Sequence, residues 1–385
     1  MRPYPRIALV VGEQSGDNLA ADLMQALRVH FPNASFFGIA GPRMIAAGCE
    51  SWEAAESLAV MGIFEIIPHL PRLLRIRRQL IKRLRADPPD VYIGVDAKEF
   101  NLSVERALKA TGIRTVQYVS PQVWAWRRGR VKSIAKAVDL MLCLLPFEKQ
   151  FYDAHHVDAR FVGHPLADQI PLHADQGAAR AALGVDQHAL CLAVLPGSRE
   201  GEVLRLGADF ARTIAWFKQQ RPACQVLAPM ANERARELFS AALSQAGILD
   251  QVRLIDGQAQ QAMVASDVLL LASGTAALEA TLAKRPMVVA YRMGKLTTWL
   301  LQGLGIVKFK YFSHPNILTD QLLVPEFYND QVRADVLGPA LLTQLDRPDR
   351  AALDAKFIDI HLQLKQGASA RAAQAVFELL TRART

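Results

Sequence analysis

Short apolar runs rich in β-branched residues alternate with helical patterns along most of the chain, which predicts parallel strands connected by helices. The predicted strands are residues 7–11, 36–39, 91–95, 115–119 and 140–144, and then 190–195, 225–227, 252–255, 268–271 and 287–290. Helical patterns in the first half cover residues 19–30, 70–85, 103–110 and 131–137. This alternation of strands and helices is interrupted near Gly163-His164-Pro165 and then resumes. We therefore predict an α/β fold of two doubly wound parallel-sheet domains that face each other across a cleft.

These patterns predict a first domain of residues 1–165 and a second of residues 166–359. The helical residues at about 360–385 could pack on the first domain or on a partner chain, so a homodimer stays open. A length of 385 residues suits two cores. The net charge of +8 favours anionic partners, without choosing among nucleic acid, phosphorylated substrates and anionic lipid.

Neither a secretory signal nor a membrane-spanning segment is expected. The apolar run at residues 7–11 is short and has no small-residue cleavage site, and residues 296–307 fall short of the ~20 apolar residues that a span requires. The four cysteines are scattered, which is typical of small buried side chains in a reducing compartment. We expect a cytosolic protein.

Ligands of open parallel sheets bind at the carboxyl ends of strands, so the turns from strand to helix are the candidate sites. The first such turn reads GEQSGD, with Gly12 and Gly16 on either side of Glu13 and Ser15. Its glycines and free helix amides suit an anion such as a phosphate. A tight turn in which Ser15 or Asp17 caps the helix is the alternative. The turn is not G-x-G-x-x-G, which disfavours a dinucleotide.

Two further turns carry charged side chains. Asp96 follows the strand at 91–95, where a carboxylate can take a proton from an acceptor hydroxyl; capping of the next helix or pairing with Lys98 is the alternative. In the second half, Gly197 and Ser198 precede Arg199, whose planar fork suits a diphosphate at a helix N-terminus. Ser198 could also cap that helix.

A fourth turn follows the strand at 268–271. Ser273, Gly274 and Thr275 open a helix with small and hydroxyl side chains, and Glu279 follows one turn later. Such a carboxylate can accept both hydroxyls of a ribose, although it could simply complement the helix dipole. Two turns of this kind in one domain favour a nucleoside diphosphate.

Residues 69–86 contain seven Lys or Arg and no acid, with leucines on one helical face. A basic amphipathic helix beside an apolar segment indicates a surface for anionic lipid and acyl chains, and an ordinary covering helix is the alternative. Interleaved rings and arginines at 124–130 could bind single-stranded nucleic acid, or form a cleft wall that binds a sugar or a phosphate. The proposed membrane contacts are Val60, Met61, Ile63, Phe64, Ile66, Arg72, Arg75, Arg78 and Lys82.

Several of these segments make the chain resemble the lipid A disaccharide synthases, a glycosyltransferase family of Gram-negative bacteria. The matches run in family order across nearly the whole chain. They are GEQSGD at 12–17, AGPRM at 40–44, VMGI at 60–63, YVSPQVWAWR at 118–127, LPFEKQFY at 145–152, GHPL at 163–166, LPGSR at 195–199 and LASGTAALE at 271–279.

The resemblance implies a GT-B fold of two Rossmann-like domains with the active site between them. It also implies an enzyme that joins UDP-2,3-diacylglucosamine to 2,3-diacylglucosamine 1-phosphate through a β-1,6 bond with release of UDP. It implies an enzyme peripheral to the cytoplasmic face of the inner membrane, with no cofactor and no nucleic acid partner. Asp96 matches the family's general base, and Arg199 the arginine of the donor diphosphate. The donor loop matches at Ser273, Gly274, Thr275 and Glu279, and a family asparagine of the cleft matches at Asn316.

The sequence departs from the family pattern at Glu99, where an aspartate is expected, and fits it loosely at residues 324–331. No D-x-D pair is present, so we expect no catalytic metal. Three other classes stay open on the residues alone. These are a two-lobed binder without catalysis, an epimerase or hydrolase of UDP-sugars and, least favoured, a nicotinamide dehydrogenase.

Overall fold

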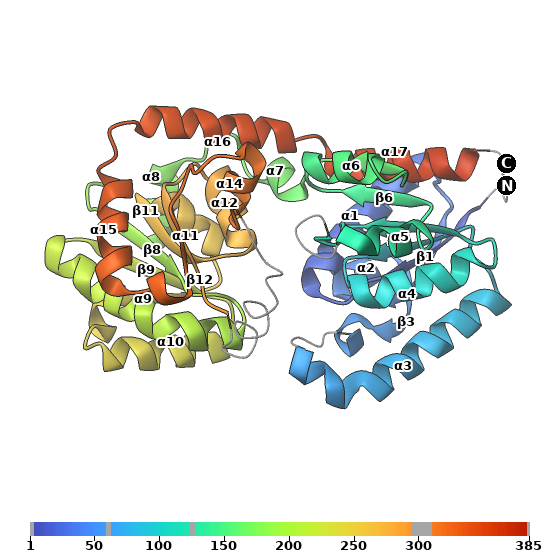
Figure 1. Ribbon diagram of the computed structural model, residues 1–385, viewed down its shortest axis with the longest axis horizontal. Helices are drawn as coiled ribbons and strands as arrows, with labels where there is room; N and C mark the ends of the chain where they lie inside the picture. The colour runs from blue at the N-terminus through green and yellow to red at the C-terminus, as the bar shows by residue number, and fades with distance from the viewer. Residues whose placement is uncertain (1–3, 59–62, 124–127, 294–309, 383–385) are drawn as a thin grey trace. The chain divides into compact units, whose positions relative to one another are not determined.

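The computed structural model describes residues 4–58, 63–123, 128–293 and 310–382, which form two compact units. The first unit comprises residues 1–168 and 364–385, and the second comprises residues 169–363. The chain leaves the first unit within α7 (Pro165–Gln169) and returns to it at the end of α16 (Arg350–Leu364) (Figure 1).

The first unit contains a seven-stranded sheet in the order β3-β2-β1-β4-β5-β6-β7, and every described pairing is parallel. Its central strands are apolar and buried along their length, as expected for strands with helices on both faces. The strands are β1 (Arg6–Val10), β2 (Ser35–Ala40), β3 (Cys49–Ala54), β4 (Val91–Val95), β5 (Arg114–Tyr118), β6 (Leu140–Cys143) and β7 (Ala159–Phe161).

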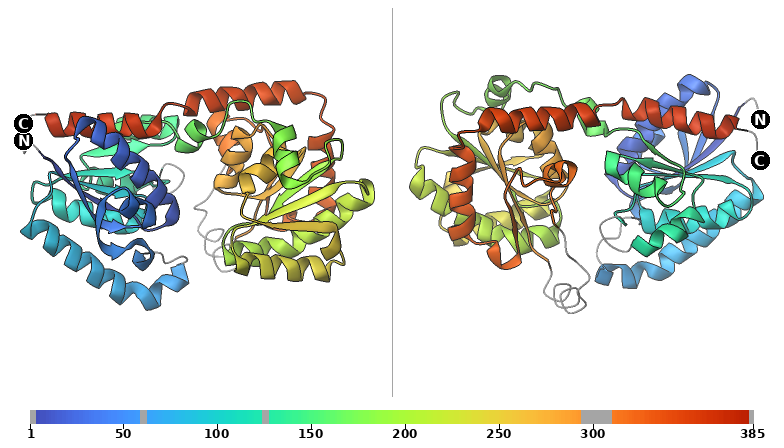
Figure 2. Two further views of the ribbon diagram at one scale, coloured as in Figure 1. Left: turned by 180° about the vertical axis from the view of Figure 1, so that it is seen from behind. Right: turned by 45° about the horizontal axis from the view of Figure 1, so that its top comes forward.

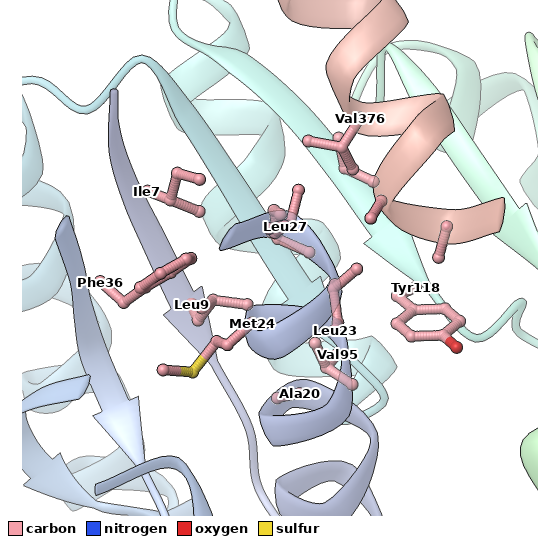
Figure 3. Packing of buried hydrophobic residues seen from close by; sticks show 14 of the residues in the cluster. Ile7, Leu9, Ala20, Leu23, Met24, Leu27, Phe36, Val95, Tyr118 and Val376 are labelled. Atoms are coloured by element: carbon pink, nitrogen blue, oxygen red, sulfur yellow. The ribbon is translucent and has the colours of Figure 1, made fainter. Parts of the chain in front are cut away.

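Helices α1 and α17 cover one face of this sheet. Leu23 and Leu27 of α1 lie between the strands and Val376 of α17 in one buried cluster (Figure 3). The C-terminal helix, whose partner the sequence left open, therefore packs on α1 of the first unit, as the views of Figure 2 also show. The helices of this unit are α1 (Gln14–His30), α2 (Pro42–Ala46), α3 (Ile63–Ala86), α4 (Lys98–Lys109), α5 (Val131–Ala135), α6 (Pro146–Asp153) and α17 (Ala368–Thr381).

The second unit contains a six-stranded sheet in the order β10-β9-β8-β11-β12-β13, again parallel at every described pairing. Its strands are β8 (Cys191–Leu195), β9 (Gln225–Met230), β10 (Val252–Asp256), β11 (Val268–Ala272), β12 (Met287–Tyr291) and β13 (Glu326–Tyr328). Its helices are α8 (Gln176–Leu183), α9 (Glu200–Gln220), α10 (Glu233–Gln245), α11 (Ala259–Ala265), α12 (Thr275–Leu282), α14 (His314–Thr319), α15 (Ala334–Leu345) and most of α16.

The predicted fold class of two parallel-sheet α/β domains is confirmed. The structure adds three edge strands that the sequence did not predict, β3, β7 and β13. Strand β3 is largely exposed and reads CESWEA, and the other two are three residues long, so none has the buried apolar run that identified the central strands. Helices α1 and α4 also begin earlier than expected, at Gln14 and Lys98.

Helix α3 is both a covering helix and a basic surface. In its C-terminal half, Ile76, Leu80 and Leu84 are buried against the sheet, whereas Leu70 is exposed, so the predicted leucine face does not pack along its whole length. No helix in the described residues has both the length and the apolar character needed to cross a bilayer.

Candidate functional site

Each sheet has one switch point, where successive strands are added on opposite sides, and such points are where open α/β sheets bind ligands. In the first unit the switch point lies between β1 and β4, and in the second between β8 and β11. The register pairs Val10 with Gly94 and Leu195 with Leu271. The turns after these strands therefore start at one sheet edge in each unit. All four turns predicted from the sequence flank a switch point.

The turn after β4 has an unusual backbone. Asp96 and Ala97 are left-handed, with φ of 51° and 38°. The Asp96 carbonyl accepts hydrogen bonds from Asn101 Nδ2 at 3.0 Å and Gln117 Nε2 at 3.1 Å, and the Asp96 amide donates to the Tyr118 carbonyl at 2.9 Å. These bonds hold a conformation that non-glycine residues rarely adopt.

Two glycines let this turn approach its neighbours. A Cβ at Gly12 would lie 2.9 Å from Cβ of Ala97, so the turn after β1 touches the turn of Asp96. A Cβ at Gly94 would lie 2.5 Å from Glu105 Oε1, so α4 could not pack this closely on β4 with a larger residue there. The structure thus brings together the predicted anion turn and the predicted base.

The Asp96 carboxylate remains accessible to water. Its side chain is 29% exposed, and its Oδ1 lies 3.4 Å from Lys98 Nζ. The pairing considered from the sequence is therefore present, whereas helix capping is absent, because Ala97 is the N-cap of α4 and no side chain caps it. The next carboxylate, Glu99, binds the Arg130 guanidinium with both oxygens, at 2.6 and 2.8 Å.

The N-terminus of α1 has no side-chain cap, with Glu13 at the N-cap position. Both candidates for that cap were wrong. Ser15 is exposed, and Asp17 instead accepts the amides of Arg43 and Met44, at 2.9 and 3.0 Å, at the start of α2. Without a side-chain cap, the first amides of α1 stay open to an anion.

In the second unit, the turn after β8 differs from the expectation. Arg199, not Ser198, is the N-cap residue of α9, and the amides of both donate to Glu202 Oε2, at 3.3 and 3.1 Å. A Cβ at Gly197 would collide with the Glu202 side chain at 2.5 Å. The protein's own carboxylate thus occupies the anion position at this helix end, and the exposed Arg199 guanidinium is left as the cation of the turn.

The turn after β11 leaves its helix end open. Gly274 is the N-cap of α12 without a side-chain cap, and a Cβ there would meet nothing within 4 Å. Ser273 Oγ donates to the Phe312 carbonyl at 3.4 Å, while Gly274 and Thr275 are exposed. Burial raises the pKa of the half-buried Glu279 above its ordinary value. These features suit a phosphate at the helix end and hydroxyl donors at Glu279.

Asn316, predicted from the sequence to contact the donor, lies in α14. Its side chain is fully buried; its Oδ1 accepts from the amides of Leu323 and Val324, and its Nδ2 donates to Glu326 Oε1 and to the Val324 carbonyl. Glu326 also accepts the amides of Phe312 and Ser313, at 3.0 and 2.7 Å. Sequence reasoning missed Glu326, which holds the loop beside Ser273. The geometry makes Asn316 a support of that loop and gives no support for direct donor contact.

The predicted membrane contacts are described only in part. Arg72, Arg75, Arg78 and Lys82 are all exposed on α3. Val60 and Met61 lie outside the described residues, as do the side chains of Ile63, Phe64 and Ile66. Among the residues that the structure describes, no group of three or more His, Cys, Asp or Glu is placed to hold a metal ion.

Solved structures with this two-unit architecture define the class of fold. The calicheamicin glycosyltransferase CalG4 matches with a TM-score of 0.62 at 14% identity, over 99% of this chain and 98% of that one. The UDP-GlcNAc 2-epimerase from Neisseria meningitidis matches with a TM-score of 0.63 at 12% identity, over 97% and 99%. The chain therefore has the GT-B fold. That fold is shared by a transferase and an epimerase, so it does not choose between these reactions.

Sequence similarity distinguishes the transferase from the epimerase. The model of the family described as lipid-A-disaccharide synthetase matches residues 7–379. The lipid-A-disaccharide synthase of Alkalilimnicola ehrlichii is 51% identical over 374 residues, which are 96% of this chain and 97% of the relative. That of Chromohalobacter salexigens is 50% identical over 380 residues, or 98% of each chain. The chain belongs to the lipid-A-disaccharide synthetase family and is a glycosyltransferase.

The supporting role of Asn316 gives a testable expectation. Asn316→Ala leaves the buried amide of Val324 without its acceptor, a loss of roughly 1–3 kcal/mol, and takes from the Leu323 amide one of its two acceptors, the other being the Gln321 carbonyl. We expect faster hydrogen exchange at these amides and a lower melting temperature without UDP. Thr319→Ala, on the same helix, removes one bond to the Pro315 carbonyl and serves as the control. Unchanged exchange in Asn316→Ala, with only UDP affinity reduced, would instead favour a direct donor contact.

Proposed function

We propose that this chain joins UDP-2,3-diacylglucosamine to 2,3-diacylglucosamine 1-phosphate through a β-1,6 bond, with inversion at the anomeric carbon and release of UDP. The family assignment over residues 7–379 supports a disaccharide-forming transferase. The single observation that carries the residue-level proposal is the pair of switch points. One presents a carboxylate on a rigid turn, and the other presents a cation beside an uncapped helix.

In this proposal the first unit binds the acceptor and Asp96 is the general base. Asp96 takes the proton of the acceptor's 6-hydroxyl while that oxygen attacks the anomeric carbon of the donor. The bond to the β-phosphate oxygen breaks in the same in-line displacement. A partly exposed carboxylate held by backbone hydrogen bonds can do this without first reorganising its turn. Lys98 Nζ lies 3.4 Å from Asp96 Oδ1.

The second unit binds the donor. Arg199 meets the negative charge that develops on the leaving UDP, and the open amides of α12 at Gly274 and Thr275 contact its phosphates. Glu279 accepts the two ribose hydroxyls. Gly197 and Ser198 shape the turn, and the amides of Ser198 and Arg199 are not free, since both donate to Glu202. The charge of the leaving group is met by the protein's own cation and dipoles, so we propose a reaction without a metal ion.

The acceptor side and the membrane are part of the same proposal. Gly12, Glu13, Ser15 and Gly16 form the turn beside Asp96, whose open amides suit a polar group of the acceptor. Exposed cations of α3, each worth ~1 kcal/mol near an anionic surface, would hold the enzyme on the cytoplasmic face of the inner membrane. A homodimer stays an open part of this proposal.

A coupling assay with both acylated sugars tests the reaction and its metal independence together. We expect disaccharide and UDP to form at the same rate with and without EDTA. Omitting the acceptor should stop consumption of the donor, since a transferase needs both substrates. An epimerase or hydrolase would instead continue to consume the donor. Loss of the product on adding EDTA, restored by a divalent cation, would overturn the metal-free mechanism.

Asp96→Asn tests the base. Asparagine tolerates the left-handed backbone and keeps the shape of the side chain, but it cannot take a proton. We expect turnover to fall by at least ~10²-fold with UDP affinity unchanged. Asp153→Asn, which changes a surface carboxylate paired with Lys149, controls for the loss of one charge. Wild-type turnover in Asp96→Asn would rule out the assignment.

UDP binding should release protons through Glu279. Burial raises the pKa of the free carboxyl, and two ribose hydroxyls would stabilise its charged form and lower that pKa again. UDP affinity should therefore rise with pH between the ordinary pKa of a glutamate, about 4.3, and its raised value. Calorimetry in buffers of different ionisation enthalpy measures the protons released. When UDP binds, Glu279→Gln should release fewer protons than the wild type. An unchanged number of protons would mean that the ribose does not bind at Glu279.

A further inference from the structure

A groove of about 420 Å³ lies on the first unit, between α3, α4 and α5, and the proposed mechanism does not use it. Three arginines line it: Arg77 from α3, Arg106 from α4 and Arg130, which immediately precedes α5. Glu99 is the acidic residue of its lining. Three guanidinium charges thus face one carboxylate, and this excess of positive charge favours an anion.

The three arginines are not equivalent. Arg130 already offers its planar fork to Glu99, with both oxygens bound at 2.6 and 2.8 Å. For Arg77 and Arg106, no acceptor is found within the described part of the chain. This pair is an ion pair within the protein, and the Glu99 side chain is 77% exposed. The two remaining arginines are available for a second anion.

The groove also has an apolar component and a defined place in the unit. Ile81, Leu102 and Ile134 contribute to its lining, so a ligand with both an anionic and an apolar part would fit. Its lining residues on α4 run from Glu99 to Ala107 along one helical face. Glu99 is in the first turn of α4, which follows the Asp96 turn directly, and Arg106 lies about 10 Å further along the helix.

We infer that this groove binds the phosphate monoester of the acylated acceptor, with Arg106 and Arg77 as its ligands; the inference rests on the proposed function. A phosphate monoester carries close to two negative charges at neutral pH, which two guanidinium forks match better than one ammonium would. Acyl carbons nearest the sugar ring contact Ile81 and Leu102. Glu99 competes with the phosphate for Arg130 and weakens the binding.

The test compares two acceptors, 2,3-diacylglucosamine 1-phosphate and the same lipid without its phosphate, each in neutral detergent micelles. Arg106→Ala should lower kcat/KM for the phosphorylated acceptor roughly tenfold, the effect of losing one charge-assisted hydrogen bond. The KM of the donor and the rate with the dephosphorylated acceptor should not change. Glu99→Gln should act in the opposite direction and lower the KM of the phosphorylated acceptor alone.

Lys132→Ala is the matched control, since it removes a cation of α5 that is exposed and does not line the groove. An equal loss with both acceptors in Arg106→Ala would mean that the groove serves the lipid surface, and would overturn the inference. If the wild type forms no disaccharide with either acceptor, the proposed function fails separately. Binding of the phosphorylated lipid to wild type and Arg106→Ala without donor then decides: equal affinities overturn the inference, and weaker binding to Arg106→Ala supports it.

Discussion

The left-handed turn at Asp96 and Ala97 is the constraint on which the position of the Asp96 carboxylate depends. A left-handed non-glycine residue costs roughly 1–2 kcal/mol, so two in succession persist only where their surroundings hold them. Here Asn101 from α4 and Gln117 from β5 donate to one carbonyl, and Gly12 leaves room for Ala97. Three elements far apart in the chain therefore fix where the carboxylate leaves the sheet.

Burial separates the two acids of this region into different roles. Glu105 is fully buried over Gly94, and desolvation raises its pKa well above the ordinary value, which favours its uncharged form. Asp96 lies at the water-exposed edge with a cation beside it. Of these two, Asp96 is the one that water can reach. The close packing of α4 on β4, which buries Glu105, is also what allows Asn101 to reach the turn.

The sequence predicted the parts of this structure that depend on local pattern. Central strands were found because both of their faces are apolar, and the four turns because their glycines and charges follow such strands directly. Strand β3 was missed because its exposed, charged sequence has no such pattern. The roles of Asp17, Glu202 and Asn316 depend on where each side chain points across a loop or toward another helix. Composition and spacing do not determine that direction.

The direction of one side chain, Glu202, makes the two helix ends at the second switch point differ as binding sites. At α9, Glu202 already accepts two amides, so a phosphate could use them only by displacing one anion with another, and little electrostatic free energy would be gained. At α12 no side chain caps the helix, and its amides are exposed. A diphosphate would therefore gain most by placing its phosphates at α12 while the Arg199 guanidinium, which projects from the self-capped turn, neutralises the charge on the departing oxygen.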